Sequence, residues 1–166
     1  MCIRIIITGG TFDKYYDEIK GELTFKDSHL PKILEQARVT NCTTLEINQL
    51  TDSLDMTAVH RQRILTSCQQ APEEQIVIIH GTDTMVQTAQ LLGQAALQKT
   101  ILLTGAMVPY AVTGSDSLFN LGFSVGAAQL LPVGVYVAMN GRIFPWDNVC
   151  KNREKGVFET VRDQPN

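Results

Sequence analysis

Short runs of apolar, β-forming residues recur along the chain, and segments of helix length separate them. We expect strands at residues 2–8, 43–47, 75–79, 99–104 and 134–139, with one more short piece at 142–144. Continuous apolar runs of this kind are typical of parallel strands that are covered on both faces. The regular alternation of strand and helix therefore predicts an α/β fold with a doubly wound, mostly parallel sheet.

Four segments between these runs have apolar residues at helical spacing. The first begins after Asp27 or Ser28, either of which can cap it, and Pro31 lies in its first turn. The second ends before Pro72, the third spans residues 84–97, and the fourth spans 118–128. With helices expected on both faces, we predict a flavodoxin-like strand order. No linker or repeat interrupts the pattern, so we expect residues 1–166 to form a single domain.

The composition is that of a globular protein, with 44% apolar and 19% charged residues. The net charge of −3 is spread along the chain, so neither nucleic acid nor a membrane is an expected partner. Charged residues near the amino terminus, Arg4, Asp13 and Lys14, disfavour a signal peptide, and we expect a cytoplasmic protein.

Four cysteines are scattered along the chain without metal-ligand spacing. They are Cys2, Cys42, Cys68 and Cys150, and no histidine pairs with them. We expect them to be reduced and partly buried, and we expect neither a metal nor a cofactor.

Two of the expected strands end in similar turns. Residues 5–11 read Ile-Ile-Ile-Thr-Gly-Gly-Thr, and residues 76–84 read Ile-Val-Ile-Ile-His-Gly-Thr-Asp-Thr. Ligands of open α/β sheets bind outside the carboxyl ends of the parallel strands. A single strand-end threonine is most often a turn or cap residue, but two such turns favour a shared crevice.

The chemistry of these turns suits a small polar ligand. Asp83 can bind an ammonium group, and the backbone amides of the glycine turns can bind an oxyanion. A threonine hydroxyl becomes a nucleophile when a base or a cation activates it. We interpret His80, on the buried side of its turn, as structural.

Nucleotide binding is disfavoured, because Gly9-Gly10 is followed by neither the later glycines nor the helix of a dinucleotide fingerprint. Residues 9–27 lack helical periodicity, and we expect a loop with at most a short hairpin near Gly21. Loops of this length in compact domains are often functional, and we expect a mobile active-site loop here.

These motifs resemble the bacterial-type L-asparaginase family. The resemblance rests on residues 8–11, 80–85, 105–109 and 119–121, and it extends from residue 3 to about residue 158. It covers the amino-terminal catalytic domain of the usual family member, and most relatives carry a second, carboxy-terminal domain.

The resemblance implies a catalytic role for five residues. Thr11 matches the primary nucleophile, and Thr82 matches the second catalytic threonine. Asp83 matches the carboxylate that holds the substrate's α-amino group, and Lys151 matches the lysine that pairs with both. The loop tyrosine that polarises the nucleophile corresponds to Tyr16, with its neighbour Tyr15 as the alternative. From the sequence alone, without the resemblance, a solvated surface lysine is the favoured interpretation of Lys151.

The resemblance also implies a substrate site. Ser53 matches the residue that holds the substrate α-carboxylate, and the carbonyl of Ala106 faces the leaving amide. At the position of Leu54 the family often has a polar residue, so the apolar side chain puts one contact with the substrate's amino group in doubt. The full implied set is Gly10, Ser53, Asp55, Gly81, Asp83 and Ala106.

The predicted function is hydrolysis of L-asparagine to L-aspartate and ammonia through an acyl-enzyme on a threonine. Three alternatives remain: a glutaminase or other small amidase, an asparagine-binding module without turnover, and an amidase domain that feeds ammonia to a partner enzyme. The resemblance further implies a homodimer or a larger homo-oligomer, since apolar surface normally covered by the second domain favours association.

Overall fold

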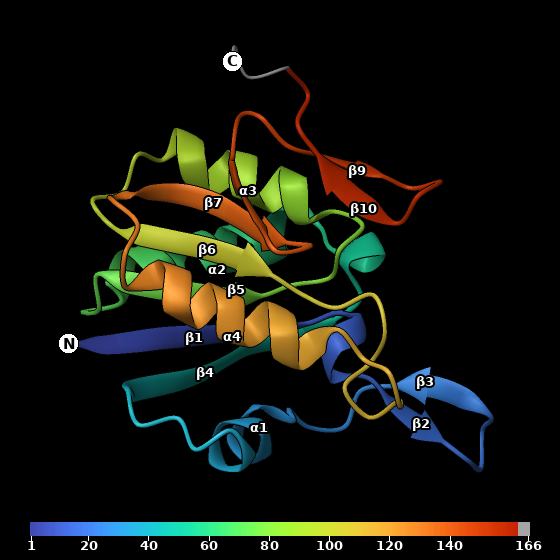
Figure 1. Cartoon of the computed structure of the whole chain (residues 1–166). Coiled ribbons are helices and arrows are strands. Elements are labelled where there is room, and N and C mark those ends of the chain that lie inside the picture. The colour runs from blue at the N-terminus through green and yellow to red at the C-terminus, as the bar shows by residue number, and fades with distance from the viewer. Residues whose placement is uncertain (163–166) are drawn as a thin grey trace.

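The computed structural model describes residues 1–162, and a six-stranded sheet forms its centre (Figure 1). The strands of this sheet, in chain order, are β1 (Cys2–Gly9), β4 (Cys42–Thr51), β5 (Gln75–Ile79), β6 (Thr100–Thr104), β7 (Gly134–Met139) and β8 (Arg142–Pro145). Their spatial order is β4-β1-β5-β6-β7-β8. The first five are parallel, and β8 pairs antiparallel with β7. The doubly wound sheet and its predicted flavodoxin-like order are confirmed.

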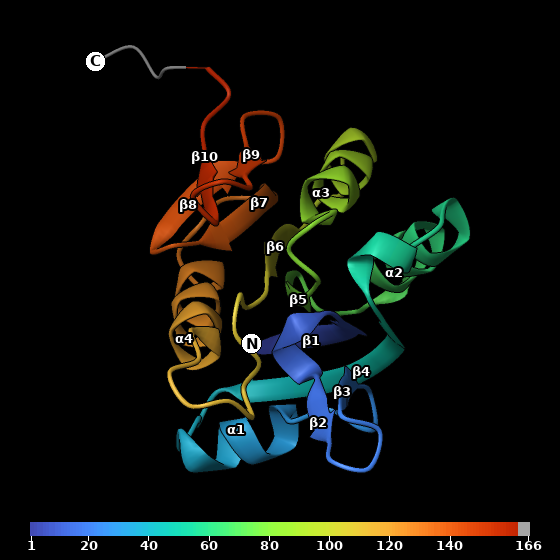
Figure 2. The same cartoon turned by 90° about the vertical axis from the view of Figure 1, so that its right-hand side faces the viewer.

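Helices cover both faces of the sheet (Figure 2). They are α1 (Leu30–Gln36), α2 (Ala58–Gln70), α3 (Met85–Gln94) and α4 (Ser117–Ala128). Along β5, Ile76 and Ile78 pack in one core with α2 and α3, whereas Val77 and Ile79 pack in the other with α1 and α4. Successive strand residues point to opposite faces, so a strand buried on both sides must be apolar at every position.

Two small hairpins lie beyond the carboxyl ends of the parallel strands (Figure 1). The first, β2 (Tyr15–Asp17) with β3 (Glu22–Thr24), turns at Gly21 as expected. The second, β9 (Cys150–Asn152) with β10 (Val157–Glu159), was not expected, because its strands have only three residues each and show no periodicity. Buried Phe158 anchors it, and the Phe158 amide donates to Asn140 Oδ1 at 2.8 Å.

Some boundaries differ from the sequence predictions. Strand β4 extends to Thr51, where we expected a loop from residue 48, and the 3₁₀ turn Ser53–Asp55 follows it. Helix α3 ends at Gln94 rather than at residue 97, because the chain turns through positive φ at Ala96. The N-cap of α1 is His29, not Asp27 or Ser28. The Ser28 hydroxyl nevertheless accepts a hydrogen bond from the Leu30 amide at 3.2 Å.

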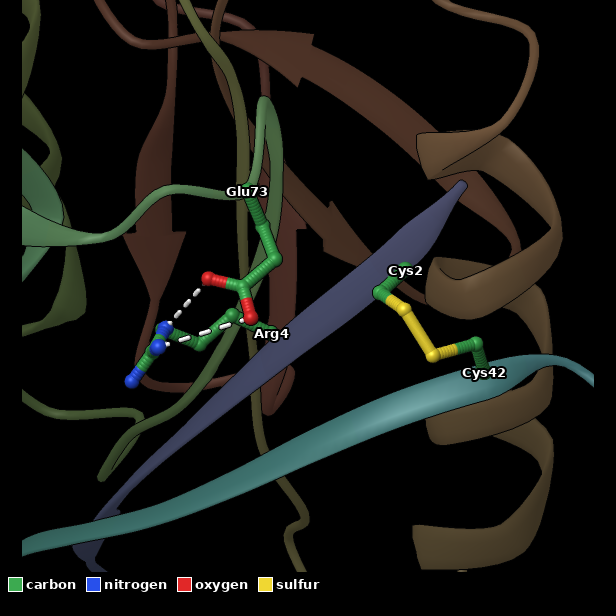
Figure 3. The surroundings of a disulfide bond; sticks show 4 residues. All are labelled: Cys2, Arg4, Cys42 and Glu73. Carbon is green, nitrogen blue, oxygen red and sulfur yellow. Dashed lines mark hydrogen bonds and ion pairs between the residues drawn. A yellow bond between two sulfur atoms is a disulfide. The ribbon is translucent and has the colours of Figure 1, made fainter.

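The cysteine prediction is wrong for one pair, since Cys2 and Cys42 form a disulfide (Figure 3). The two residues are register partners on β1 and β4, with their Cα atoms 4.5 Å apart. That adjacency depends on strand register across 40 residues of sequence, which the spacing of the cysteines does not reveal. Cys68 and Cys150 are free, and burial raises the pKa of the Cys68 thiol to about 12.

Arg4 interrupts the apolar run of β1 and forms ion pairs with two neighbouring segments. Its guanidinium lies 2.7 Å from Glu73 Oε2, just before β5, and 2.8 Å from Glu46 Oε2 on β4. Figure 3 shows Arg4 and Glu73 close to the disulfide, near the amino ends of the strands. In the described part of the chain, no helix is both long and apolar enough to cross a membrane.

Candidate active site

Two glycine turns touch each other at the carboxyl ends of β1 and β5. Gly10 has a φ of 72°, and a Cβ placed on it would lie 2.5 Å from the Gly81 Cα. A Cβ on Gly81 would in turn lie 2.6 Å from the Ser53 Cβ. Only residues without a side chain allow this approach, since no real Cβ tolerates such contacts. The glycines therefore bring the turns that carry Thr11, Thr82 and Ser53 side by side.

Thr82, Asp83 and Lys151 form one hydrogen-bonded group. Lys151 Nζ donates to Thr82 Oγ1 at 2.8 Å and to Asp83 Oδ1 at 2.9 Å. Thr82 is 6% exposed, and the Lys151 side chain is 10% exposed. Lys151 comes from β9, so the unexpected hairpin delivers the ammonium to a threonine 69 residues away in sequence.

The lysine determines where the Thr82 proton can go. Because Thr82 Oγ1 accepts from Lys151, its own hydrogen must point elsewhere. In the structure it points toward Met107 Sδ at 3.6 Å, a weak acceptor. The hydroxyl can therefore exchange this contact for a better acceptor on a ligand.

Asp83 has a second cationic neighbour on the same hairpin. Arg153 Nη1 lies 3.8 Å from Asp83 Oδ1, and Arg153 Nη2 donates to the Asp83 carbonyl at 3.3 Å. The Arg153 side chain is largely exposed. The sequence reasoning missed this residue, although its position two residues after Lys151 was a usable signal.

Ser53 lies between the two strand-end turns and the start of α3. Its side chain is buried, and its Oγ accepts a hydrogen bond from the Thr84 amide at 3.3 Å. The Thr84 hydroxyl donates back to the Ser53 carbonyl at 2.7 Å. Thr84 is the N-cap of α3 and its side chain makes no capping bond, but Ser53 satisfies the Thr84 amide, one of the free donors at the start of the helix.

His80 has the structural role that we predicted. It is fully buried, and its ring nitrogens lie 2.8 Å from the Gly81 carbonyl and 2.8 Å from Thr88 Oγ1. A carbonyl only accepts, so Nδ1 carries the proton and Nε2 accepts from the Thr88 hydroxyl. Burial lowers the pKa of His80 from 6.5 to about 4, which keeps the ring neutral. The ring thus fixes the turn that presents Thr82.

The turn that contains Ala106 is held by Asp116, which the sequence did not single out, and by Asn120, which lies in the 119–121 motif but had no assigned role. Asp116 accepts hydrogen bonds from the amides of Met107 and Val108, each at 3.0 Å. Asn120 Nδ2 donates to the Gly105 carbonyl at 2.9 Å and to Asp116 at 2.9 Å. The sequence signal for this support was an aspartate four residues before the asparagine of the 119–121 motif.

Thr11 begins a 3₁₀ turn, Thr11–Asp13, whose other residues are buried. Asp13 Oδ2 accepts from the Ser28 hydroxyl at 2.9 Å, and Asp13 Oδ1 accepts from the His29 amide at 2.9 Å. Burial raises the pKa of Asp13, and these hydrogen bonds oppose the rise. Thr11 itself is half-buried and directly follows Gly10, whose backbone lies against Gly81.

Two residues of the implied set lie apart from this group. Tyr16 is 61% exposed on β2, whereas Tyr15 stacks on His29 with 3.9 Å between ring centroids. Burial, followed by the charges of Asp27 and Asp13, raises the pKa of Tyr15. Asp55 is exposed, and its amide donates to the Asp52 carbonyl at 3.0 Å. The roles of Tyr16 and Asp55 stay predictions.

A group of donors suited to a metal ion does not occur among residues 1–162. The chemistry that the arrangement offers is that of hydroxyls, one ammonium, one carboxylate and the amides of two glycine turns. Such a set can bind a small polar molecule and polarise a carbonyl group. Fold and site together define an α/β protein with a polar site at the carboxyl ends of its parallel strands.

Comparisons with known proteins identify the family. The sequence model described as "Asparaginase, N-terminal" matches residues 2–164. The chain therefore belongs to the asparaginase family.

Individual relatives agree with this assignment. "L-asparaginase 1" of Escherichia coli (strain K12) is 29% identical over 93% of this chain and 48% of the relative. A component of the glutamyl-tRNA(Gln) amidotransferase of Methanococcus vannielii is 34% identical over 93% of this chain and 37% of the relative. The solved thermostable L-asparaginase of Thermococcus kodakarensis superimposes with a TM-score of 0.85 at 25% identity, covering 99% of this chain and 52% of that one. The chain thus spans about half the length of these proteins or less.

Proposed function

We propose that this chain hydrolyses L-asparagine to L-aspartate and ammonia, with Thr11 as the nucleophile. The observation that carries the proposal is the Thr82–Lys151–Asp83 group beside the Gly10 and Gly81 turns. A sensor of amino acids needs a charged clamp but not two hydroxyls flanking one pocket. The half-buried Thr11 hydroxyl and the lysine-bound Thr82 hydroxyl favour an enzyme over the binding module.

In the proposed mechanism, Thr11 Oγ attacks the side-chain amide carbon of the substrate and forms a tetrahedral intermediate. Backbone amides of the glycine turns stabilise the negative charge that develops on the amide oxygen. The nitrogen takes a proton and leaves as ammonia, which gives an ester between the aspartyl group and Thr11. Water then hydrolyses this ester, releases L-aspartate and returns the proton to Thr11.

Lys151 and Thr82 would move the protons in both steps. The ammonium donates to Thr82 Oγ1, so the Thr82 hydrogen is free to be given to the leaving nitrogen. Asp83 compensates the charge of Lys151 and is proposed to bind the substrate's α-amino group. Ser53 would hold the α-carboxylate, and the carbonyl of Ala106 would face the leaving amide. Tyr16, or Tyr15, would polarise the nucleophile after the loop closes.

A second candidate, glutaminase activity, is favoured by one specific observation. Leu54 is 63% exposed beside Ser53, where the family resemblance implies a polar residue at the amino-group end of the substrate. An apolar residue there removes one hydrogen bond to the substrate's amino end, and a less firmly held amino end allows the side chain of L-glutamine, one methylene longer, to reach Thr11. Transfer of ammonia to a partner enzyme has weaker support, although one relative is part of an amidotransferase by name.

We further propose a single asparaginase amino-terminal-type domain that acts as a homodimer or larger homo-oligomer, with L-asparagine as its ligand. A cytoplasmic location stays a prediction. The Cys2–Cys42 disulfide argues against it, because disulfides are typical of oxidising compartments.

The decisive experiment is ammonia release from L-asparagine by the purified chain, compared with Thr11→Ala and Thr82→Val. We expect release by the parent chain and a loss of at least about a thousandfold in each variant. Equal rates in all three proteins would overturn the assignment. The same assay with L-glutamine decides between the two amidase candidates.

A further inference from the structure

Lys14 and Asp52 form an ion pair that joins the Thr11 turn to the Ser53 turn. Lys14 Nζ contacts Asp52 Oδ2 directly, and the side chains are only 18% and 30% exposed. Lys14 follows the 3₁₀ turn at once, and its amide donates to the Thr11 carbonyl at 3.3 Å. Asp52 is the N-cap of the turn Ser53–Asp55. The pair therefore connects the residue after the proposed nucleophilic turn to the residue before the proposed carboxylate-binding serine.

The same lysine also contacts the hairpin of the active-site loop. Its ammonium lies 5.7 Å from the centroid of the Phe25 ring, just after β3. A cation at this distance over an aromatic face is attracted to the ring. Lys14 thus touches three parts of the site: the Thr11 turn, the Asp52 side chain and the end of the hairpin.

A further anchor of the loop acts on its other side. Asp13 binds Ser28 and His29 and so fixes the base of the loop to α1. The tip of the hairpin is solvent-exposed, as Ile19 at 93% exposure shows. Among the described residues of this loop, Lys14 is the one that forms an ion pair, and its partner Asp52 directly precedes Ser53.

We propose that the Lys14–Asp52 pair is a positioning device that holds residues 14–27 against the Ser53 turn and thereby fixes Thr11. The inference rests on the proposed function for its effect on rate, whereas its effect on the loop can be measured separately. A displacement of about 1 Å at a nucleophile lowers the rate by up to about a hundredfold. An ion pair that restrains Lys14, directly after the Thr11 turn, therefore affects the rate. Partly buried ion pairs are screened less by solvent than exposed ones.

The test uses Asp52→Asn, Lys14→Gln and the double variant, with Lys14→Arg as the conservative variant. Hydrogen–deuterium exchange of residues 15–27 reports the loop, and ammonia release reports kcat and KM. The control is Lys155→Gln, which removes the exposed Lys155–Glu159 ion pair at 3.3 Å, outside the site.

Each single variant is expected to raise exchange in residues 15–27 and to lower kcat/KM by about tenfold, with little change in thermal midpoint. The double variant should lose no more than either single one, because both remove the same interaction. Added salt should lower kcat/KM of the parent chain more than that of Asp52→Asn. Lys14→Arg should restore the slow exchange, and Lys155→Gln should behave as the parent chain.

Unchanged exchange of residues 15–27 in Asp52→Asn would overturn the inference, as would multiplicative losses in the double variant. If the parent chain releases no ammonia while exchange rises in both single variants, the tie stands and the amidase proposal falls.

Discussion

The two ends of the parallel strands differ in the kind of contact that joins neighbouring strands. At the amino ends, strands are tied by a disulfide between Cys2 and Cys42 and by ion pairs of Arg4 with Glu46 and Glu73. At the carboxyl ends, glycines at positions 10 and 81 let backbones touch without side chains. At the first end, the charges of Arg4, Glu46 and Glu73 are paired with one another, whereas the second end leaves hydroxyls and amides for a ligand.

This difference separates stability from reactivity in one sheet. Cross-strand ties lower the free energy of the folded state relative to the unfolded chain, and they do not require a pocket. Glycine turns cost conformational entropy but allow close approach and expose backbone amides. Substitutions at the two ends should therefore affect different measurements.

The largest expected effect is on the carboxyl side. Lys151→Met should lower kcat for ammonia release by about a thousandfold, because it removes the donor to Thr82 and the partner of Asp83. The matched control is Lys155→Met on the same hairpin, whose ammonium is exposed and pairs with Glu159. Similar rates for both variants would contradict a role for Lys151 in the site.

On the amino side, Cys2→Ser should lower the free energy of unfolding by about 2–4 kcal/mol, because the disulfide restrains a 40-residue separation in the unfolded chain. Urea unfolding measures the change, and kcat/KM should stay within about twofold of the parent value. A reductant should destabilise the parent chain and leave Cys2→Ser unaffected. If Cys2→Ser lost activity in proportion to its loss of stability, the two ends of the strands would not serve separate roles.

A pH effect of about 3 kcal/mol is expected at His80, whose pKa burial lowers from 6.5 to about 4. Above pH 6.5 the ring is neutral in both states, so its contribution is fully present. As the pH falls from 6.5 toward 4, the unfolded state binds a proton that the folded state does not, and stability decreases. The free energy of unfolding at pH 7 and at pH 4.5 should differ less in His80→Asn than in the parent chain. An equal difference in both proteins would show that His80 is not the group responsible.

Whether a feature at either end of the strands can be predicted from the sequence depends on how far apart its residues lie along the chain. The glycine turns and their threonines are adjacent in sequence to the apolar runs that precede them, so residues 8–11 and 80–84 were readable. Lys151 was named only through the family resemblance, because the β9–β10 hairpin that brings it to Thr82 has no local sequence pattern. Predicting the disulfide requires the register of β1 and β4. Assigning a role to Asp116 requires the conformation of the loop that it supports. Polar three-residue strands such as β9 give no periodicity from which to predict them.

A smaller effect is expected at the contact between the glycine turns. Gly10→Ala should lower kcat/KM by about a hundredfold, since its Cβ would collide with Gly81 and shift the Thr11 turn. Gly114→Ala is the control, because Gly114 also has positive φ, at 83°, but a Cβ placed on it would have no atom within 4 Å. Ammonia release by the control should match the parent chain, and equal losses in both would assign the effect to backbone strain alone.

The central claim is that Thr11 carries the acyl group, and trapping with hydroxylamine tests it most directly. Hydroxylamine competes with water for an acyl-enzyme, so the parent chain should convert L-asparagine partly to aspartyl hydroxamate, in a ratio to L-aspartate that rises with hydroxylamine concentration. Thr11→Ser should retain hydroxamate formation, and Thr11→Ala should form none. Ammonia release by the parent chain without any hydroxamate, or hydroxamate formation by Thr11→Ala, would contradict the account.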